Sequence, residues 1–250
     1  HTMEINSDGV VNILDAAKLV CPNAKLFFAS SSEIFGSSKK NEALNENSER
    51  SPCNPYGVSK LSAENFVRLY REKYGLFACS GILFSHEGPL RSRHFVTRKI
   101  TFNLVRLKSD NEKYFELGSV NSARDWGSSI DYARAMHSMI KADSPKDFVI
   151  SSGQLTSVRQ FFDISAKEIG FDPVLEGSKN NEVFIDKPSG RILAKVSPKY
   201  LRAFDTIPLL GNSNLIKENL GWFPTQGIND IVKSMVEADI LRRKRGMIDI

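Results

Sequence analysis

Apolar and polar positions along the chain follow two periods, which predict helices and strands in alternation. In residues 5–20 the apolar positions recur three or four residues apart, as on one face of a helix. The short apolar runs 25–30 and 77–84 instead predict buried strands. The same patterns predict further helices at 56–73, 95–108, 130–142 and 228–243, further strands at 114–117 and 147–151, and a helix opened by a capping box of Ser157 and Gln160. Apolar strands that alternate with helices indicate an α/β fold with a parallel sheet between helices.

Two polar stretches interrupt these elements. Residues 36–55 are rich in Asn, Ser, Glu and Pro, and residues 85–94 carry charges beside a glycine and a proline. Ligands of parallel sheets bind beyond the carboxyl ends of the strands. Because residues 30–35 and 85–91 lie just after predicted strands, we expect functional residues there. The last hundred residues are more irregular up to the final helix.

The composition is that of a globular chain. The 250 residues are 41% hydrophobic and 25% charged, which excludes a disordered chain and allows one large domain or two closely associated ones. No stretch approaches the roughly 18 consecutive apolar residues of a membrane span, and no secretory signal is visible. The formal net charge is +5, but four positive charges are adjacent at residues 242–245 and the rest is nearly neutral. We therefore expect no nucleic-acid partner and no membrane partner.

Cysteine and histidine are sparse in this sequence. The three cysteines, Cys21, Cys53 and Cys79, cannot all pair in disulfides, so we expect reduced thiols and a cytoplasmic location. Cys79 lies in an apolar run and is expected in the core. The four histidines have no spacing typical of metal ligands, so no metal site is expected.

The strongest chemical signal is a tyrosine followed four residues later by a lysine, Tyr56 and Lys60. On a helix this spacing places both side chains on one face. The ammonium favours the phenolate form of the tyrosine, which makes the phenol a usable base near pH 7. About 0.8 such pairs of tyrosine with lysine or arginine are expected by chance in this composition, so the pattern needs support from its surroundings.

A serine-rich turn precedes this helix and follows the first predicted strand, at Ser30-Ser31-Ser32-Glu33. A hydroxyl there can bond a substrate oxygen and share its proton with Tyr56, and the carboxylate can act as a second acid–base group. The alternative is a turn whose hydroxyls only satisfy backbone amides. Together, hydroxyl, tyrosine and lysine resemble the catalytic set of the short-chain dehydrogenase/reductase superfamily.

A closer resemblance runs through nearly the whole chain. Residues 29–36, Ala-Ser-Ser-Ser-Glu-Ile-Phe-Gly, resemble the stretch Ala-Ser-Thr-Ser-Glu-Leu-Tyr-Gly of the GDP-mannose 4,6-dehydratase family. The similarity continues through 51–60, 81–87, 95–100, 124–127, 131–132, 147–150, 157–161 and 220–222. The run Phe-Val-Thr-Arg-Lys-Ile at 95–100 is far more specific to this family than the spacing of Tyr56 and Lys60.

The resemblance implies a fold and an assembly. It implies a Rossmann-like, doubly wound parallel sheet whose N-terminal strands are missing, with a smaller C-terminal α/β substrate domain. Residues 1–86 and about 121–153 would form the nucleotide-binding part, and about 87–120 and 154–250 the substrate-binding part. A homodimer or homotetramer is implied as well.

The resemblance also implies an activity. Family members convert GDP-mannose to GDP-4-keto-6-deoxymannose with tightly held NADP, in the nucleotide-sugar metabolism that leads to GDP-fucose. By this resemblance, Tyr56 removes the 4-hydroxyl proton while hydride leaves C4, and Lys60 supports Tyr56 and holds the cofactor ribose. Glu33 then removes the C5 proton, and water leaves C6 with Glu33 or Ser31 assisting. Hydride finally returns to C6.

Further positions match family residues that bind the cofactor or the substrate. His86 and Arg91 match positions that contact the cofactor, as Tyr56 and Lys60 do. The residues at positions suited to the GDP moiety are Lys99, Arg124, Arg202 and Asp205. Arginine suits such a site because its planar guanidinium donates two parallel hydrogen bonds to phosphate oxygens.

Some positions depart from the family pattern. Ser31 replaces a threonine and keeps its hydroxyl, and Phe35 replaces a tyrosine as a change in packing. Ser85 and Leu90 replace Asn and Arg and so affect the substrate contacts rather than the catalytic set. The chain also contains no Gly-x-x-Gly-x-x-Gly turn, whose backbone amides hold the pyrophosphate in Rossmann sheets. We therefore expect the 250 residues by themselves to bind NADP poorly.

Other functions stay open at this point. Another epimerase or dehydratase of the extended short-chain family is one alternative, because 4-epimerases need only the hydroxyl, the tyrosine and the lysine. Glu33 favours a dehydratase, since elimination needs a base at C5. A catalytically silent fragment or oligomerisation partner is the other alternative, suggested by the missing glycine-rich turn. The choice between NADP and NAD and the exact hexose also stay open.

Overall fold

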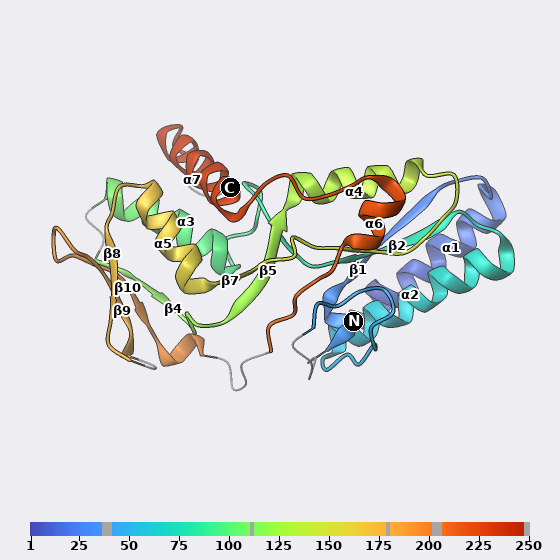
Figure 1. The fold of residues 1–250 in the computed structure, drawn as a ribbon, viewed down its shortest axis with the longest axis horizontal. Helices are drawn as coiled ribbons and strands as arrows, with labels where there is room; N and C mark the ends of the chain where they lie inside the picture. The colour runs from blue at the N-terminus through green and yellow to red at the C-terminus, as the bar shows by residue number, and fades with distance from the viewer. Residues whose placement is uncertain (37–41, 111–112, 179–180, 202–206, 248–250) are drawn as a thin grey trace. The chain divides into compact units, whose positions relative to one another are not determined.

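The structure is a computed structural model, and it describes residues 1–36, 42–110, 113–178, 181–201 and 207–247 (Figure 1). The chain forms two compact units. The first unit comprises residues 1–86, 125–154 and 207–225, and the second comprises residues 87–124, 155–206 and 226–250. Each unit is therefore assembled from separate stretches of the chain.

A parallel sheet lies at the centre of the first unit. Its strands, in the order β1-β2-β6, are β1 (Leu26–Ser31), β2 (Ala78–Leu83) and β6 (Phe148–Ile150). Both pairs are parallel, and Ser31 lies opposite Leu83, which lies opposite Ile150. The carboxyl ends of these strands therefore meet at one edge, as the sequence pattern predicts.

Helices cover both faces of this sheet (Figure 1). A π-helical turn (Glu4–Asp8) leads into α1 (Gly9–Val20), and the other helices are α2 (Pro55–Tyr74), α4 (Ser129–Lys141) and α6 (Asn214–Leu220). Ala78 packs with Leu14 of α1 and Val67 of α2, whereas the next residue, Cys79, packs with Met139 of α4 and Ile216 of α6. Since neighbouring residues of a strand point to opposite faces, α1 and α2 lie on one side and α4 and α6 on the other. Cys79 is fully buried, so its expected place in the core is confirmed.

Two buried aspartates hold residues 207–225 in the first unit. Asp125 is 1% exposed and accepts hydrogen bonds from the backbone N–H of Ser152 at 2.8 Å and of Gly211 at 3.1 Å. Asp131 is equally buried and accepts the backbone N–H of Thr225 at 2.7 Å. Each buried carboxylate thus bonds a segment distant in sequence, which offsets the cost of taking its charge out of water.

The second unit combines helices with an antiparallel-rich sheet. Within its described residues the helices are α3 (Val96–Ser109), α5 (Val158–Glu168) and α7 (Ile228–Lys244), and the sheet runs β4 (Phe115–Leu117), β10 (Ile192–Val196), β9 (Val183–Asp186) and β8 (Pro173–Glu176). The rings of Phe162 in α5 and Phe184 in β9 stack with centroids 3.8 Å apart and join helix to sheet. Ser157 Oγ accepts the N–H of Gln160 at 3.1 Å, and the N–H of Ser157 donates to Gln160 Oε1 at 2.8 Å. The predicted capping box is therefore confirmed.

Several short elements lie where the sequence predicts none. The strands β8, β9 and β10 and the helix α6 fall in the irregular last hundred residues. The polar stretch 85–94 begins with β3 (Ser85–Glu87), which forms a sheet of order β3-β5-β7 with β5 (Ala123–Ser128) and β7 (Leu155–Ser157). Elements of three to seven residues are too short to display a period, which is why the pattern misses them.

The parallel sheet and the α/β class expected from the sequence are confirmed. By compactness, residues 207–225 belong to the first unit, whereas the expected substrate-binding part includes them. The binding roles of the two parts stay predictions. In the part of the chain that the structure describes, no helix is both long enough and apolar enough to cross a membrane.

Candidate active site

The turn after β1 carries the first candidate residues. Ser31 ends β1, and a single 3-10 turn (Ser32–Phe35) follows directly. Ser31 Oγ accepts the backbone N–H of Glu33 at 3.3 Å and so caps this turn. A serine hydroxyl can accept such a bond and still donate its own proton. The Ser31 hydroxyl therefore does satisfy a backbone amide, which is the alternative that the sequence leaves open. This hydrogen bond is compatible with a catalytic role for the same hydroxyl.

Helix α2 presents Tyr56 and Lys60 in its first turns. Asn54 is the N-cap of α2, and Pro55 at the first helical position fixes the backbone for helix entry. Lys60 Nζ donates to the carbonyl oxygen of Ala29 in β1 at 3.0 Å and lies 5.6 Å from the centroid of the Tyr56 ring. The lysine ammonium therefore lies close to both the strand and the phenol ring.

The two side chains differ in exposure. Tyr56 is 43% exposed, whereas Lys60 is half-buried. Burial lowers the pKa of the Lys60 ammonium below its ordinary value. An exposed phenol is accessible to a sugar hydroxyl, and a half-buried ammonium acts on a neighbouring phenolate more strongly than an ammonium in water does.

Two glycines let the turn after β1 pack closely against the segment that leads into α2. A Cβ at Gly36 would lie 1.7 Å from the carbonyl oxygen of Ser51, and Gly36 has a φ of 66°, which favours glycine. A Cβ at Gly57 would lie 2.5 Å from the carbonyl oxygen of Glu33. The backbone at Glu33 therefore lies directly against the first turn of α2.

A side chain also connects Glu33 to the start of α2. Asn54 Nδ2 donates to Glu33 Oε2 at 2.7 Å, and Asn54 Oδ1 accepts the backbone N–H of Gly57 at 2.8 Å. Glu33 is half-buried. The first unit thus brings together the residues expected to be catalytic, which are Ser31, Glu33, Tyr56 and Lys60.

His86 is the expected cofactor residue that lies in the first unit. Its Nδ1 lies 3.0 Å from the carbonyl oxygen of Phe84, and its ring centroid lies 5.0 Å from that of Tyr132. Tyr132 is fully buried. The imidazole is therefore fixed both by the backbone and by a core tyrosine.

Two other expected binding residues, Arg91 and Lys99, line one cavity of about 650 Å³ in the second unit. The Arg91 guanidinium lies 3.5 Å from the centroid of the Phe95 ring, and its Nε lies 3.3 Å from Glu87 Oε2. Lys99 Nζ lies 3.8 Å from the centroid of the Tyr200 ring. Burial lowers the pKa of the Lys99 ammonium. Arg91 and Lys99 therefore each make a cation–π contact with an aromatic ring.

The cavity is cationic. Its described lining also includes Arg93, Arg98 and Arg242 and no carboxylate, although Arg98 and Arg242 both pair with Asp239, which is not a lining residue. Such a wall attracts phosphate oxygens, because arginine and lysine donate charge-assisted hydrogen bonds to them. The second unit therefore offers a place for a phosphorylated ligand.

The remaining expected substrate residues lie elsewhere. Arg124 is not among the residues that line the cavity, and its Nη1 donates to the carbonyl oxygen of Ala123 at 2.7 Å. Arg202 and Asp205 lie outside the described residues. Their assignments to the GDP moiety stay predictions.

Sequence reasoning missed two residues of these sites. Asn54 had a signal, since an asparagine followed by proline before a helical pattern is a typical N-cap. Tyr200 had none, because it ends a 3-10 turn (Pro198–Tyr200) about a hundred residues from the helix it faces. Only the folded chain brings Tyr200 to Lys99.

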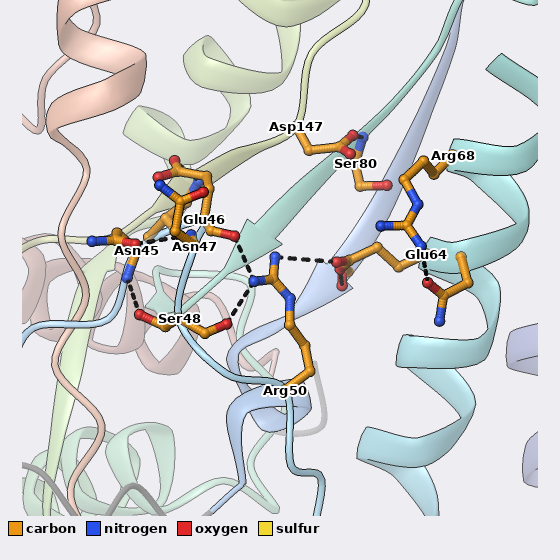
Figure 2. Close-up of polar contacts among 12 residues, drawn as sticks. Asn45, Glu46, Asn47, Ser48, Arg50, Glu64, Arg68, Ser80 and Asp147 are labelled. Carbon is orange, nitrogen blue, oxygen red and sulfur yellow. Dashed lines mark hydrogen bonds and ion pairs between the residues drawn. The ribbon is translucent and has the colours of Figure 1, made fainter. Parts of the chain in front are cut away.

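The first unit has a cavity of about 590 Å³ whose lining includes paired charges (Figure 2). Arg50 donates to the carbonyl oxygens of Glu46 at 2.5 Å and of Ser48 at 2.7 Å, and its guanidinium lies 3.6 Å from Glu64 Oε1. Ser30 Oγ donates to Glu64 Oε2 at 2.5 Å. Burial raises the pKa of the Glu64 carboxyl, and the Ser30 hydrogen bond opposes this. These groups satisfy one another, which indicates a structural role.

The sequence contains three cysteines and four histidines that could take part in other chemistry. The cysteines Cys21, Cys53 and Cys79 form no disulfide with one another. Across the described ranges, no cluster of three or more His, Cys, Asp or Glu side chains is arranged to hold a metal ion.

Comparisons with known proteins extend over the same residues. The family model described as GDP-mannose 4,6 dehydratase matches residues 1–235. The GDP-mannose 4,6 dehydratase of Drosophila melanogaster is 36% identical over 248 residues, and that of Homo sapiens is 37% identical over 242 residues. These matches cover 98% and 96% of this chain but 62% and 65% of the two relatives. The chain therefore spans less than two thirds of the length of these relatives.

A solved structure supports the fold. The structure of RMD from Pseudomonas aeruginosa complexed with NADPH matches with a TM-score of 0.82 at 20% identity, over 96% of this chain and 74% of that chain. At this identity the likeness concerns the fold alone, and it confirms the expected Rossmann-like α/β architecture. The family match over residues 1–235 and the identity over nearly the whole sequence confirm the resemblance drawn from the motifs, and the chain belongs to the GDP-mannose 4,6-dehydratase family.

Proposed function

We propose that the protein containing this chain is a sugar-nucleotide 4,6-dehydratase that converts GDP-mannose to GDP-4-keto-6-deoxymannose with NADP. The observation that carries the proposal is the assembly of a carboxylate, Glu33, with Tyr56 and Lys60 at the carboxyl end of β1, in a member of this family. Epimerisation at C4 needs no such carboxylate, so Glu33 favours elimination. A cytoplasmic homodimer or homotetramer is part of the same proposal.

The residues of the chain fit the cofactor at its nicotinamide ribose. The Lys60 ammonium carries three N–H donors, and the bond to Ala29 uses one, so this half-buried group can also bind ribose hydroxyls. We assign His86 and Arg91 to the cofactor as well, since the Arg91 guanidinium suits a phosphate oxygen. Bound NADP would accept the C4 hydride of the sugar and return it at C6, so that the reaction is redox-neutral overall.

Tyr56 acts in the first step as the base. Its phenol oxygen removes the proton of the 4-hydroxyl as C4 loses its hydride, and a ketone forms at C4. The Lys60 ammonium, 5.6 Å from the ring centroid, attracts the negative charge that develops on the phenol oxygen as this proton moves. Ser31 donates a hydrogen bond to the same sugar oxygen.

Glu33 acts in the second step. The ketone at C4 acidifies the C5–H bond, and Glu33 removes this proton while the electron pair forms the C5–C6 double bond and the hydroxyl leaves C6. Glu33, directly or through Ser31, passes a proton to the departing hydroxyl. Of the two protons removed from O4 and C5, one leaves in water and the other returns to C5 when hydride adds to C6. Protons and electrons therefore balance.

The second unit holds the GDP moiety. Lys99 lies in the cationic cavity that suits a diphosphate, and we assign Arg124, Arg202 and Asp205 to the same moiety. The lining residues Arg93 and Lys99 carry cationic groups that can donate charge-assisted hydrogen bonds to phosphate oxygens.

Isotope transfer tests this function. The protein expressed from its complete coding sequence is incubated with NADP and GDP-mannose deuterated at C4, and the products are identified by NMR and mass spectrometry. The proposal predicts a 4-keto-6-deoxy product with the deuterium at C6. A hexose inverted at C4 that keeps its 6-hydroxyl would establish an epimerase instead, and unchanged substrate would establish a silent protein.

A further inference from the structure

Asn54 connects the two parts of the proposed site. Its Nδ2 donates to Glu33 Oε2 at 2.7 Å, and its Oδ1 accepts the N–H of Gly57 at 2.8 Å. Gly57 belongs to the first turn of the helix that carries Tyr56. One amide group therefore spans from the carboxylate after β1 to the helix that bears the tyrosine.

We propose that Asn54 is a positioning residue for the dehydration, which holds the Glu33 carboxylate by a hydrogen bond in the orientation that proton removal from C5 requires. The inference rests on the proposed function. It assigns to Asn54 a role beyond helix capping, in the elimination step that follows the oxidation of C4.

The orientation of the amide is fixed by the chemistry of its partners. A backbone N–H only donates, so the group that faces Gly57 must be the amide oxygen, and the NH₂ group is the one that faces Glu33. Because an NH₂ group donates, its partner at Glu33 is an unprotonated oxygen. The bond occupies Oε2 and leaves Oε1 as the oxygen that can take a proton.

The surrounding backbone keeps this arrangement tight. The Glu33 carbonyl lies so close to Gly57 that no Cβ fits between them. Asn54 is half-buried, and the proline after it restricts its backbone to the extended conformation it adopts here, with φ of −145° and ψ of 160°. The amide therefore reaches Glu33 from a rigid base.

Capping alone does not account for an asparagine at this position. Ser, Asp and Asn cap helices about equally well, since each offers an oxygen to the first backbone N–H groups. Of these, only asparagine can also donate through a nitrogen to a carboxylate 2.7 Å away. Serine keeps the cap but is too short, and aspartate keeps the cap but presents a second negative charge.

The test compares Asn54→Ser and Asn54→Asp with the unsubstituted protein, all expressed from the complete coding sequence. Asn212→Ser is the matched control, because Asn212 Oδ1 accepts the backbone N–H of Asn214 at 3.0 Å at an exposed site. We expect both variants to remain folded, since the cap is retained. Their melting temperatures should fall by about 2–6 °C, because each loses the hydrogen bond to Glu33 and the aspartate adds a like charge. With GDP-mannose and NADP, reduced cofactor is followed by absorbance and product by NMR.

The proposal predicts a step-specific loss. Elimination slows by about 10- to 100-fold in both variants, as for a misplaced acid–base group, while C4 oxidation and KM change little, so reduced cofactor accumulates. In Asn54→Asp the acid limb of the elimination rate moves to higher pH by about one unit, because two adjacent carboxylates share a proton. Wild-type elimination rates and pH profiles in both variants would overturn the proposal.

A second measurement separates this inference from the proposed function. The titration of the Glu33 carboxyl carbon is followed by ¹³C NMR and assigned by its loss in Glu33→Gln. A midpoint that differs between the Asn54 variants and the unsubstituted protein supports the positioning role, even if GDP-mannose is not the substrate. Identical midpoints in all variants would overturn it, even if GDP-mannose is converted.

Discussion

Lys60 Nζ lies 5.6 Å from the centroid of the Tyr56 ring while it donates to the carbonyl oxygen of Ala29 at 3.0 Å. A strand carbonyl therefore fixes the position of the charge that acts on the phenol. This hydrogen bond joins α2 to β1, so the relative position of tyrosine and lysine depends on the sheet as well as on helical spacing.

Replacement of Lys60 tests this relationship. Lys60→Met removes the charge, and we expect kcat to fall by about 100-fold or more, the typical contribution of a supported acid–base group. Lys60→Arg keeps a charge that does not titrate. Because burial lowers the pKa of Lys60, the alkaline limb of the rate profile should move to higher pH in this variant. Equal kcat for Lys60→Met and the unsubstituted protein would contradict the role.

The close approach at Gly57 gives a second prediction. In Gly57→Ala the new Cβ would lie 2.5 Å from the Glu33 carbonyl oxygen, so the turn and the helix must separate. We expect a loss of about 1–3 kcal/mol in the free energy of unfolding, as for overpacking, together with reduced elimination activity. Chemical denaturation and the product assay measure the two effects.

Gly9→Ala is the matched control, because Gly9 also lies in the first turn of a helix but its Cβ would meet its nearest atom at an ordinary 3.4 Å. This variant should be as stable as the unsubstituted protein or more stable, since alanine is the better helix former. Equal behaviour of the two alanine variants would show that the packing at Gly57 is unimportant.

The residues near Tyr56 show which parts of the candidate site can be predicted from the sequence. Spacing and resemblance predict Ser31, Glu33, Tyr56 and Lys60, and the structure places them together in the first unit. The Asn54 amide, which connects Glu33 to the helix, could not be predicted, because a cap signal shows only that the side chain accepts from the backbone. Its second partner lies 21 residues away in sequence.

The buried ion pair of the second unit gives a third prediction. Arg98 Nη2 lies 2.7 Å from Asp239 Oδ1, and the two side chains are 2% and 1% exposed. Arg98→Met leaves a buried carboxylate without this partner, so we expect a loss of about 3–5 kcal/mol in the free energy of unfolding. Arg243→Met, which breaks the more exposed pair with Asp110, should cost about 0–1 kcal/mol. Similar losses in the two variants would contradict this account.

The buried Glu64 carboxyl gives a prediction for pH. Burial raises its pKa in the folded protein, so the folded state keeps this proton to a higher pH than the unfolded chain does. Its contribution to stability is therefore complete below the ordinary carboxyl pKa of about 4.3 and is lost as the pH rises through the raised value. Glu64→Gln imitates the protonated form and does not titrate.

Denaturation of both proteins between pH 4 and pH 7 checks this sign. The unsubstituted protein should lose free energy of unfolding relative to Glu64→Gln as the pH rises. The opposite trend would mean that Arg50, 3.6 Å away, outweighs the burial of the carboxyl.

The second unit contains elements that can be predicted from the sequence pattern and elements that cannot. The helices α3 and α7 are long enough to display a period, and the sequence predicts both near their observed bounds, whereas the capping box predicts only the start of α5. The strands β8, β9 and β10 are four or five residues long, and their place in one sheet depends on pairing between segments rather than on local pattern. The contact of Lys99 with Tyr200 depends on the same tertiary pairing.

The most direct test of the account is a single-turnover measurement on Glu33→Gln in the protein expressed from its complete coding sequence. Glutamine keeps the shape of the side chain but cannot take a proton from C5, whereas Tyr56 and Lys60 are untouched. With GDP-mannose and NADP, the account predicts that reduced cofactor forms and persists while no 4-keto-6-deoxy product appears. Product formation at the rate of the unsubstituted protein would contradict it.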